Sequence, residues 1–215
     1  MITSTPGEHL GIPRLGAAVL VHGFTRSPRH LRVLSEALTD RGVATVRPAL
    51  SAFQWSHSIN NAGYLTKVAE RLRRGLPDAP LAVVGHSAGA AAGSWLAAEL
   101  AEAGMDVRVL VMVDGVESPA GLMRRAWPRL AGVPVRALCA PPSTCNREGR
   151  LETWLISQGG DVECEVLPGM GHGDIEGDPG RVYEWACGDE STPELRRLVI
   201  ATISDWVVSG LTRDR

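Results

Sequence analysis

The 215-residue sequence lacks the long hydrophobic run that a membrane-spanning helix needs, since its longest apolar stretch, residues 107–113, has only the length of a strand. It also lacks a basic segment followed by an apolar one near its start, so no secretory signal peptide is indicated. Neither sign of charge is in excess, because 22 basic and 24 acidic residues leave a formal net charge of −2. These absences argue against membrane and nucleic-acid partners and predict a cytoplasmic protein.

Cysteine is scarce and irregularly spaced. The four cysteines form no CxxC pair and no cluster with histidine at zinc-binding spacing. We therefore predict no metal site, and nothing in the sequence requires an organic cofactor. In the absence of an export signal we expect all four thiols to be reduced, with a disulfide as the alternative. They are Cys139, Cys145, Cys164 and Cys187.

Short apolar runs alternate with amphipathic helical patterns along almost the whole chain. Strands are predicted at 17–21, 43–48, 81–85, 107–113, 133–140 and 162–167. Helices are predicted at 27–42, 60–74 and 88–103, around Leu151 and Leu155, and at 193–209. Ser191 and Glu194 match a capping box at the start of the last helix. This alternation predicts one α/β domain over residues 16–215, with a parallel sheet between two layers of helices, after an N-terminal tail at 1–15.

The clearest motif is GHSAG at residues 85–89, which follows the apolar run LAVV and precedes an alanine-rich helical pattern. A serine between glycines at a strand-to-helix junction is typical of a nucleophile held on a tight turn at the carboxyl edge of a sheet. A serine hydroxyl becomes reactive when a base takes its proton. We therefore predict that Ser87 is a catalytic nucleophile, with a purely structural turn as the alternative.

Two other loops contain the groups that such a nucleophile needs. An HG pair ends the first apolar run, so the backbone N–H groups of Phe24 and Ala88 are predicted to form an oxyanion hole. His172 stands in a glycine-rich loop just past the last strand, where its ring can reach the sheet edge, and is predicted to be the general base. His22 and His86 are expected to brace the turns in which they stand.

The motifs HGF (22–24), GHSAG (85–89) and GMGH (169–172), in this order and on this strand pattern, resemble those of the α/β-hydrolase family. The stretch HGFTRSPRHLRVLSEALTDRG resembles small bacterial carboxylesterases and thioesterases without a cap domain. The resemblance extends over nearly the whole chain from residue 16 onward. It implies a single-domain α/β-hydrolase fold with a minimal cap and serine-dependent acyl chemistry, but it does not specify the substrate.

The acid of the expected catalytic triad stands at an unusual place. In most of the family an aspartate follows the strand before the last, but here that loop reads CAPPSTCNREGR and contains none. Some relatives, of the haloalkane-dehalogenase and chlorophyllase types, carry the acid one strand earlier, where this chain has Asp114. A carboxylate is needed to fix the imidazole tautomer and stabilise the imidazolium. We therefore predict Asp114 as the acid, with Glu148, Glu117 and a serine–histidine dyad as alternatives.

Two segments bear on substrate access. The segment between the strands ending at 113 and starting at 133 is too short for the helical cap of many relatives. Residues 173–190 are inserted before the last helix, and long loops without their own structure tend to be functional. We predict that this insertion, with Tyr183 and Trp185, forms a flap over the acyl or leaving-group side. A solvated acidic loop is the alternative.

Other substrate contacts are predicted from side-chain type alone. Phe53, Trp55 and Trp127 are candidate pocket walls, although core filling explains most tryptophans. Three arginines cluster in the short segment above the site: Arg124, Arg125 and Arg129. They could attract an anionic substrate such as a carrier-bound thioester, but a solvated helix face is the preferred interpretation.

The predicted activity is hydrolysis of a carboxylic ester or thioester, free or carrier-bound, through an acyl-enzyme on Ser87. An acyltransferase or cyclase would use the same intermediate with an alcohol, amine or thiol as acceptor. A non-catalytic binding module that kept the fold is the third hypothesis. The predicted partner is a small-molecule acyl substrate, with neither nucleic acid nor a membrane.

Overall fold

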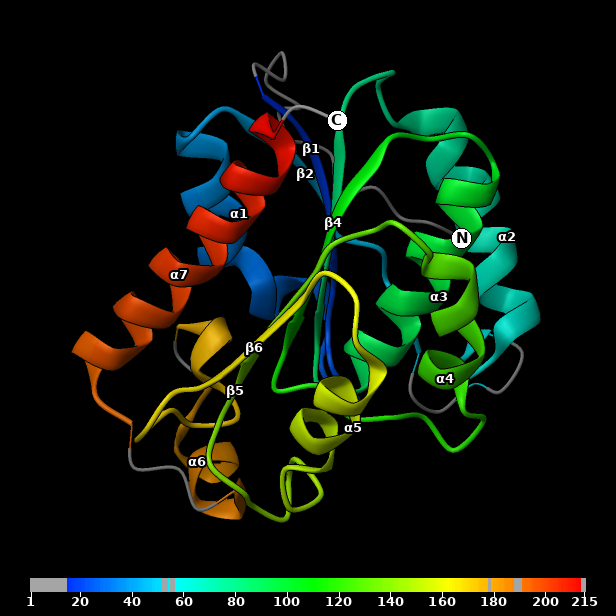
Figure 1. Ribbon diagram of the computed structural model, residues 1–215. Coiled ribbons are helices and arrows are strands. Elements are labelled where there is room, and N and C mark those ends of the chain that lie inside the picture. The colour runs from blue at the N-terminus through cyan, green and yellow to red at the C-terminus, as the bar shows by residue number, and fades with distance from the viewer. Residues whose placement is uncertain (1–14, 52–53, 55–56, 178, 188–190, 214–215) are drawn as a thin grey trace.

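The computed structural model describes residues 15–51, 54, 57–177, 179–187 and 191–213. The predicted N-terminal tail at 1–15 therefore lies, apart from Leu15, outside the described residues. Within the described ranges the chain forms one three-layer unit, in which a sheet separates two groups of helices (Figure 1).

Six parallel strands form the sheet, in the order β2-β1-β3-β4-β5-β6. The inner strands are apolar on both faces and almost wholly buried, as expected for a parallel sheet covered on both sides. Only the edge strand β6 alternates between half-buried and exposed residues. The sheet predicted from the sequence is confirmed, with these bounds: β1 Gly16–Val21, β2 Val43–Val46, β3 Leu81–His86, β4 Val107–Val113, β5 Val135–Cys139 and β6 Val162–Val166.

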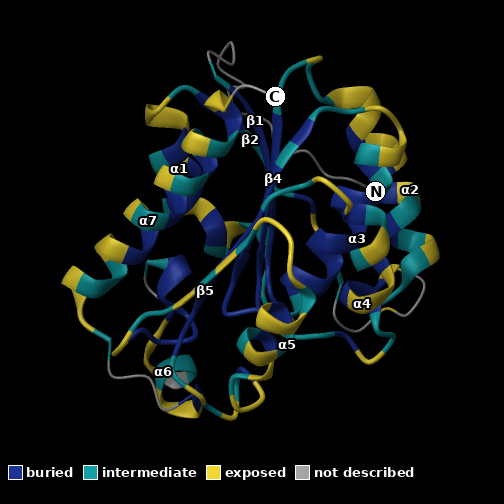
Figure 2. Cartoon of the chain, viewed as in Figure 1, coloured by how far each residue is buried: buried dark blue, intermediate teal, exposed yellow. Residues whose placement is uncertain are grey.

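Helices cover both faces of the sheet, and Figure 2 shows their buried sides turned toward it. One face packs against α1 (Arg32–Asp40) and α7 (Pro193–Thr212). The other packs against α2 (Ala62–Gly75), α3 (Ala88–Glu102), α4 (Leu122–Ala126) and α5 (Arg150–Gln158). The short helix α6 (Arg181–Cys187) and the 3₁₀ turns η1 (Pro28–Leu31), η3 (Trp127–Leu130) and η4 (Asp174–Glu176) complete the described elements. Within the described part of the chain, no helix combines the length and the apolar character that crossing a membrane requires.

α7 begins at Pro193 as predicted, but its N-cap lies one residue later than the capping box indicates. Thr192 is the N-cap, and its hydroxyl accepts a hydrogen bond from the Leu195 amide at 3.2 Å. The Ser191 hydroxyl instead donates to the buried carboxylate of Asp174 at 2.6 Å. The prediction of Ser191 as the cap is wrong because this carboxylate, remote in sequence, is the acceptor for its hydroxyl.

The expectation of four reduced thiols is wrong for two of them. Cys145, in the loop after β5, and Cys187, at the end of α6, form a disulfide with a Cα–Cα distance of 5.4 Å. The two residues are 42 positions apart, and only the folding of α6 beside the β5–α5 loop brings them together. Cys139 and Cys164 are free thiols on the neighbouring strands β5 and β6.

The insertion at 173–190 is not a loop without structure, as the sequence suggested. It contains η4 and α6, and η4 is fully buried against α1 and α7. Burial of Ile175 in the α1–α7 cluster explains the difference, because an apolar anchor holds the segment on the body of the domain. The segment after β4 contains only the short α4 and η3, in agreement with the expected minimal cap.

Candidate functional site

Ser87 stands on a strained turn between β3 and α3. Its backbone has φ 54° and ψ −127°, a conformation that residues other than glycine rarely adopt. The turn is possible only because two glycines allow close approach: a Cβ on Gly85 would lie 2.4 Å from the Gly89 carbonyl oxygen, and a Cβ on Gly89 would lie 2.3 Å from that of Val21. The GHSAG spacing therefore holds a serine at the carboxyl edge of the sheet.

His172 reaches this serine from the loop after β6. Its Nε2 atom lies 3.0 Å from the hydroxyl oxygen of Ser87, and both residues are buried. His86 holds the loop in place, since its Nε2–H donates to the backbone carbonyl of His172 at 2.7 Å. Burial lowers the pKa of His86 well below its usual range, so this histidine is neutral and acts as a fixed donor. His86 was expected to brace the turn in which it stands, but its hydrogen bond holds the His172 loop instead.

Asp114, at the end of β4, contacts the other side of the His172 ring. Its Oδ2 atom is hydrogen-bonded to Nδ1 of His172, and the carboxylate is 2% exposed. The two alternative acids lie elsewhere. Glu117 accepts three backbone hydrogen bonds around the start of α4, at 2.7 to 3.0 Å, and Glu148 is exposed. The structure thus brings Ser87, His172 and Asp114 together.

Asn146 is a functional candidate that reasoning from the sequence missed. Its Nδ2 atom donates to Oδ1 of Asp114 at 3.1 Å, and the backbone N–H of Ala140 donates to the same oxygen at 3.0 Å. Asn146 is itself fixed, because its Oδ1 atom accepts from the amides of Ser143 and Gly149. The available signal was the lack of an aspartate in the loop after β5, where most relatives carry the acid. In this chain that loop instead supplies Asn146, which orients Asp114.

The Cys145–Cys187 disulfide joins this loop to α6. Cys145 directly precedes Asn146, and α6 also carries Tyr183, whose ring stacks on that of His172 with centroids 6.1 Å apart. The guanidinium of Arg26 lies 4.1 Å from the centre of the same tyrosine ring. The disulfide therefore limits how far the loop that contacts Asp114 can move relative to α6, which contacts His172.

The predicted oxyanion loop lies against the serine. A Cβ on Gly23 would be 3.1 Å from the Cβ of Ser87, so the backbone leading to Phe24 passes directly beside the nucleophile. His22 braces this loop as expected: its Nδ1 atom donates to the Gly23 carbonyl at 2.9 Å, and its Nε2 atom accepts from the Leu50 amide. Ala88 opens α3, where the first backbone N–H groups have no partner within the helix.

The structure separates the predicted pocket residues. Phe53 and Trp55 lie outside the described residues. Tyr183 reaches the His172 ring, whereas Trp185 on the same helix is 84% exposed. Trp127 packs edge-to-face on Trp154 and belongs to the rim of the core rather than to the catalytic contacts.

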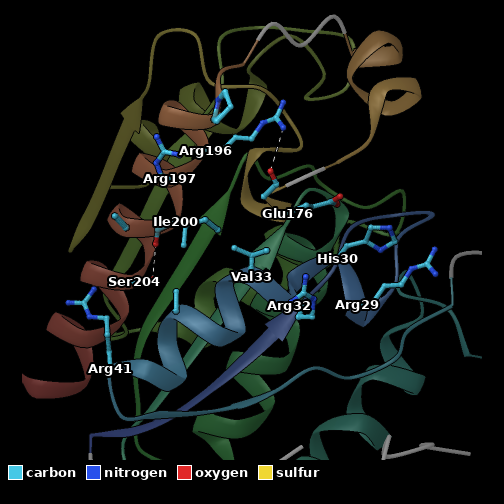
Figure 3. A pocket seen from close by; sticks show the side chains of 14 residues that line it. Arg29, His30, Arg32, Val33, Arg41, Glu176, Arg196, Arg197, Ile200 and Ser204 are labelled. Carbon is cyan, nitrogen blue, oxygen red and sulfur yellow. Dashed lines mark hydrogen bonds between the residues drawn. The ribbon is translucent and has the colours of Figure 1, made fainter.

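Two cavities differ in their relation to these residues. A groove of about 1020 Å³ lies between α1 and α7 (Figure 3). None of Ser87, Asp114 and His172 lines this groove. A smaller pocket of about 140 Å³ lies between the 115–117 loop, α4 and α5. Asn146 and Val116 line this smaller pocket, and the Val116 amide donates to the backbone carbonyl of Ser87 at 2.9 Å. The smaller pocket is therefore the one that adjoins the catalytic candidates.

Among the residues that the structure describes, no group of three or more His, Cys, Asp or Glu side chains is placed to hold a metal ion. The arrangement instead joins a serine hydroxyl, an imidazole and a carboxylate in one line of contacts. Such a line can move a proton from the hydroxyl to the imidazole while the carboxylate stabilises the resulting charge.

Solved structures with similar folds are α/β hydrolases. The esterase domain of a protein from Rhodothermus marinus superposes with a TM-score of 0.65 at 15% identity, over 93% of this chain and 88% of that one. The monoacylglycerol lipase of Paleococcus ferrophilus gives a TM-score of 0.66 at 14% identity, over 92% of this chain and 96% of that one. The thioesterase domain from the curacin biosynthetic pathway superposes with a TM-score of 0.61 at 14% identity, over 91% of this chain and 92% of that one. At these identities the likeness establishes the fold.

Comparison of the sequence with protein families identifies the family itself. The profile of the thioesterase domain matches residues 19–126, half of the chain, from β1 through the serine turn to α4. No curated protein sequence matches the chain significantly. The predicted α/β-hydrolase fold is confirmed, and the chain belongs to the thioesterase domain family of α/β hydrolases.

Proposed function

We propose that this protein hydrolyses a carboxylic ester or thioester through a covalent acyl-enzyme on Ser87. The observation that carries the proposal is the continuous line of contacts from the Ser87 hydroxyl through the His172 ring to the Asp114 carboxylate. Membership of the thioesterase domain family supports acyl ester or thioester chemistry in general. The roles of the individual residues are our inference from their geometry.

In the first half of the reaction, the Ser87 oxygen attacks the carbonyl carbon of the substrate while Nε2 of His172 takes the hydroxyl proton. The N–H groups of Phe24 and Ala88 stabilise the negative oxygen of the tetrahedral intermediate. The bond to the leaving alcohol or thiol then breaks, and His172 returns the proton to it. Water, deprotonated by His172, attacks the acyl-Ser87 ester and releases the carboxylic acid and free Ser87.

Covalent labelling tests this proposal directly. A fluorophosphonate is expected to add to folded protein with a mass shift on the peptide that contains Ser87, because the probe reacts with activated serine hydroxyls and loses fluoride. Boiled protein and the Ser87→Ala variant serve as controls. Absence of labelling in folded protein, while a known serine hydrolase in the same mixture is labelled, would remove the acyl-enzyme from consideration.

The fate of the acyl group distinguishes hydrolysis from acyl transfer, the alternative that shares this intermediate. The enzyme can be acylated with an activated ester and then given water alone or water with an alcohol, amine or thiol. Hydrolysis predicts release of free acid at the same rate in each case. A rate that rises only with one acceptor would favour an acyltransferase.

Asn146→Ala is expected to lower kcat by about tenfold with little change in KM, since a hydrogen bond to a charged group is worth about 1.5–3 kcal/mol. Asn146 is a positioning residue, because it acts on Asp114 and not on the substrate. The Ser143→Ala variant, which alters the same loop without touching Asp114, is the matched control. The downfield proton resonance of His172 Nδ1–H should shift in Asn146→Ala alone. If only the melting temperature changes, Asn146 has a structural role.

A further inference from the structure

Three arginines line the small pocket beside the catalytic candidates. Arg124 comes from α4, Arg147 from the loop after β5, and Arg150 from the first residue of α5. The only acidic residue in the lining is Glu117, whose carboxylate oxygens already accept three backbone N–H groups. The pocket therefore has an excess of positive charge.

These three arginines are exposed and have no acidic partner among the described residues. No side-chain hydrogen bond or ion pair joins Arg124, Arg147 or Arg150 to another described residue. In the larger groove of Figure 3, by contrast, most arginines are neutralised by acidic residues, as in the pairs Arg41–Asp205 and Arg197–Glu194. The chain leaves the guanidinium groups of the small pocket available to an external anion.

The arginines that the sequence grouped together do not act as one cluster. Arg129 pairs with Glu99 and Glu102 and lies over the Trp95 ring, and Arg125 lies over the same ring. Only Arg124 of that group lines the pocket, where it meets two arginines from a loop and a helix later in the chain. Arg124 and Arg125 are exposed, in agreement with the expected solvated helix face, whereas Arg129 is half-buried and paired with two carboxylates.

The remaining lining suits the apolar stem of an anionic group. Met123, Leu151 and Trp154 form the walls, and the first two are buried. The pocket is connected to the reaction centre by Asn146, which binds Asp114, and by Val116, which binds the Ser87 backbone. The pocket is therefore one residue contact away from both the acid and the nucleophile turn.

We propose that this pocket binds a carboxylate or phosphate group of the substrate, so that the enzyme prefers negatively charged acyl esters or thioesters to neutral ones of the same size. Guanidinium groups pair with both anions through two parallel hydrogen bonds. The inference rests on the proposed function, which it narrows to a substrate class. The anion can belong to the acyl half or to the leaving group, and the experiment separates the two.

The test compares kcat/KM within two matched substrate pairs. Mono-4-nitrophenyl glutarate and 4-nitrophenyl valerate differ by a carboxylate on the acyl chain, and the butyryl thioesters of 4′-phosphopantetheine and pantetheine differ by a phosphate on the leaving group. We expect about a tenfold preference for the anionic member of one pair, weakening as salt is raised. Arg147→Gln and Arg150→Gln are each expected to reduce that ratio severalfold.

Arg73→Gln is the matched control. Arg73 is exposed in the last turn of α2, just before β3 begins, and so lies at the opposite edge of the sheet from Ser87. The ratio should not change in this variant. Equal turnover within both pairs, or equal loss of ratio in the control, would overturn the pocket assignment.

Failure of the proposed function has a different signature, namely no turnover of any of the four substrates. In that case calorimetry with glutarate and with 4′-phosphopantetheine still decides the question. Binding that is saturable, salt-sensitive and weakened by Arg147→Gln supports the anion pocket. Absence of such binding overturns it.

Discussion

Ser87→Ala is expected to lower kcat for ester hydrolysis by about 10⁶-fold, the scale on which a serine hydrolase loses activity without its nucleophile. The substitution removes only the hydroxyl, which lies 3.0 Å from Nε2 of His172. The Cβ atom that contacts the Gly23 loop is kept, and alanine bears the same backbone strain at φ 54° as serine does. The fold should therefore survive, as circular dichroism and thermal unfolding can check. Release of 4-nitrophenol from a short-chain ester measures the loss.

Ser94→Ala provides a matched control on the same helix. Ser94 is buried in α3, and its hydroxyl donates to the Ala90 carbonyl at 2.8 Å without touching the catalytic candidates. Its removal should leave kcat within about twofold, because the same carbonyl also takes part in the helix hydrogen bonds. Comparable losses in both variants would mean that helix disruption, and not a missing nucleophile, explains the effect of Ser87→Ala.

Asp114→Asn is expected to lower kcat by about 10³- to 10⁴-fold by imposing the wrong tautomer on His172. Two donors, the Ala140 amide and Asn146, meet the Oδ1 position of residue 114. They select the amide oxygen of the substituted side chain, so its NH₂ group faces Nδ1 of His172. Nδ1 must then accept a hydrogen bond, and the proton moves to Nε2, where it prevents removal of the Ser87 proton. Steady-state kinetics on the same short-chain ester measure the effect.

Glu148→Gln is the control for the choice of acid. Glu148 was an alternative in the sequence, but it is exposed and does not contact His172 in the structure. Its substitution should leave kcat within about twofold, since an exposed charge away from the reacting atoms has little effect. A near-normal rate in Asp114→Asn together with a large loss in Glu148→Gln would transfer the acid role to Glu148.

The strands and the serine turn could be predicted from the sequence because they depend on residues close together in the chain. The apolar run 107–113 became β4 with identical bounds, and the helix expected at 88–103 became α3 at Ala88–Glu102. The N-cap of α7 was displaced by one residue, from Ser191 to Thr192, because Asp174 binds the Ser191 hydroxyl. Local patterns predicted elements well where no remote side chain intervened.

The sequence by itself determined the α/β architecture, the strained turn at Ser87 and the presence of His172 in a loop at the same edge, because parallel strands place their carboxyl ends together. Only the tertiary structure decided that Asp114 meets His172, that Asn146 holds Asp114, and that Cys145 bonds Cys187. It also decided which arginines share a pocket. These contacts join segments 32 or more residues apart, and the packing of the helices between them sets how closely such segments approach.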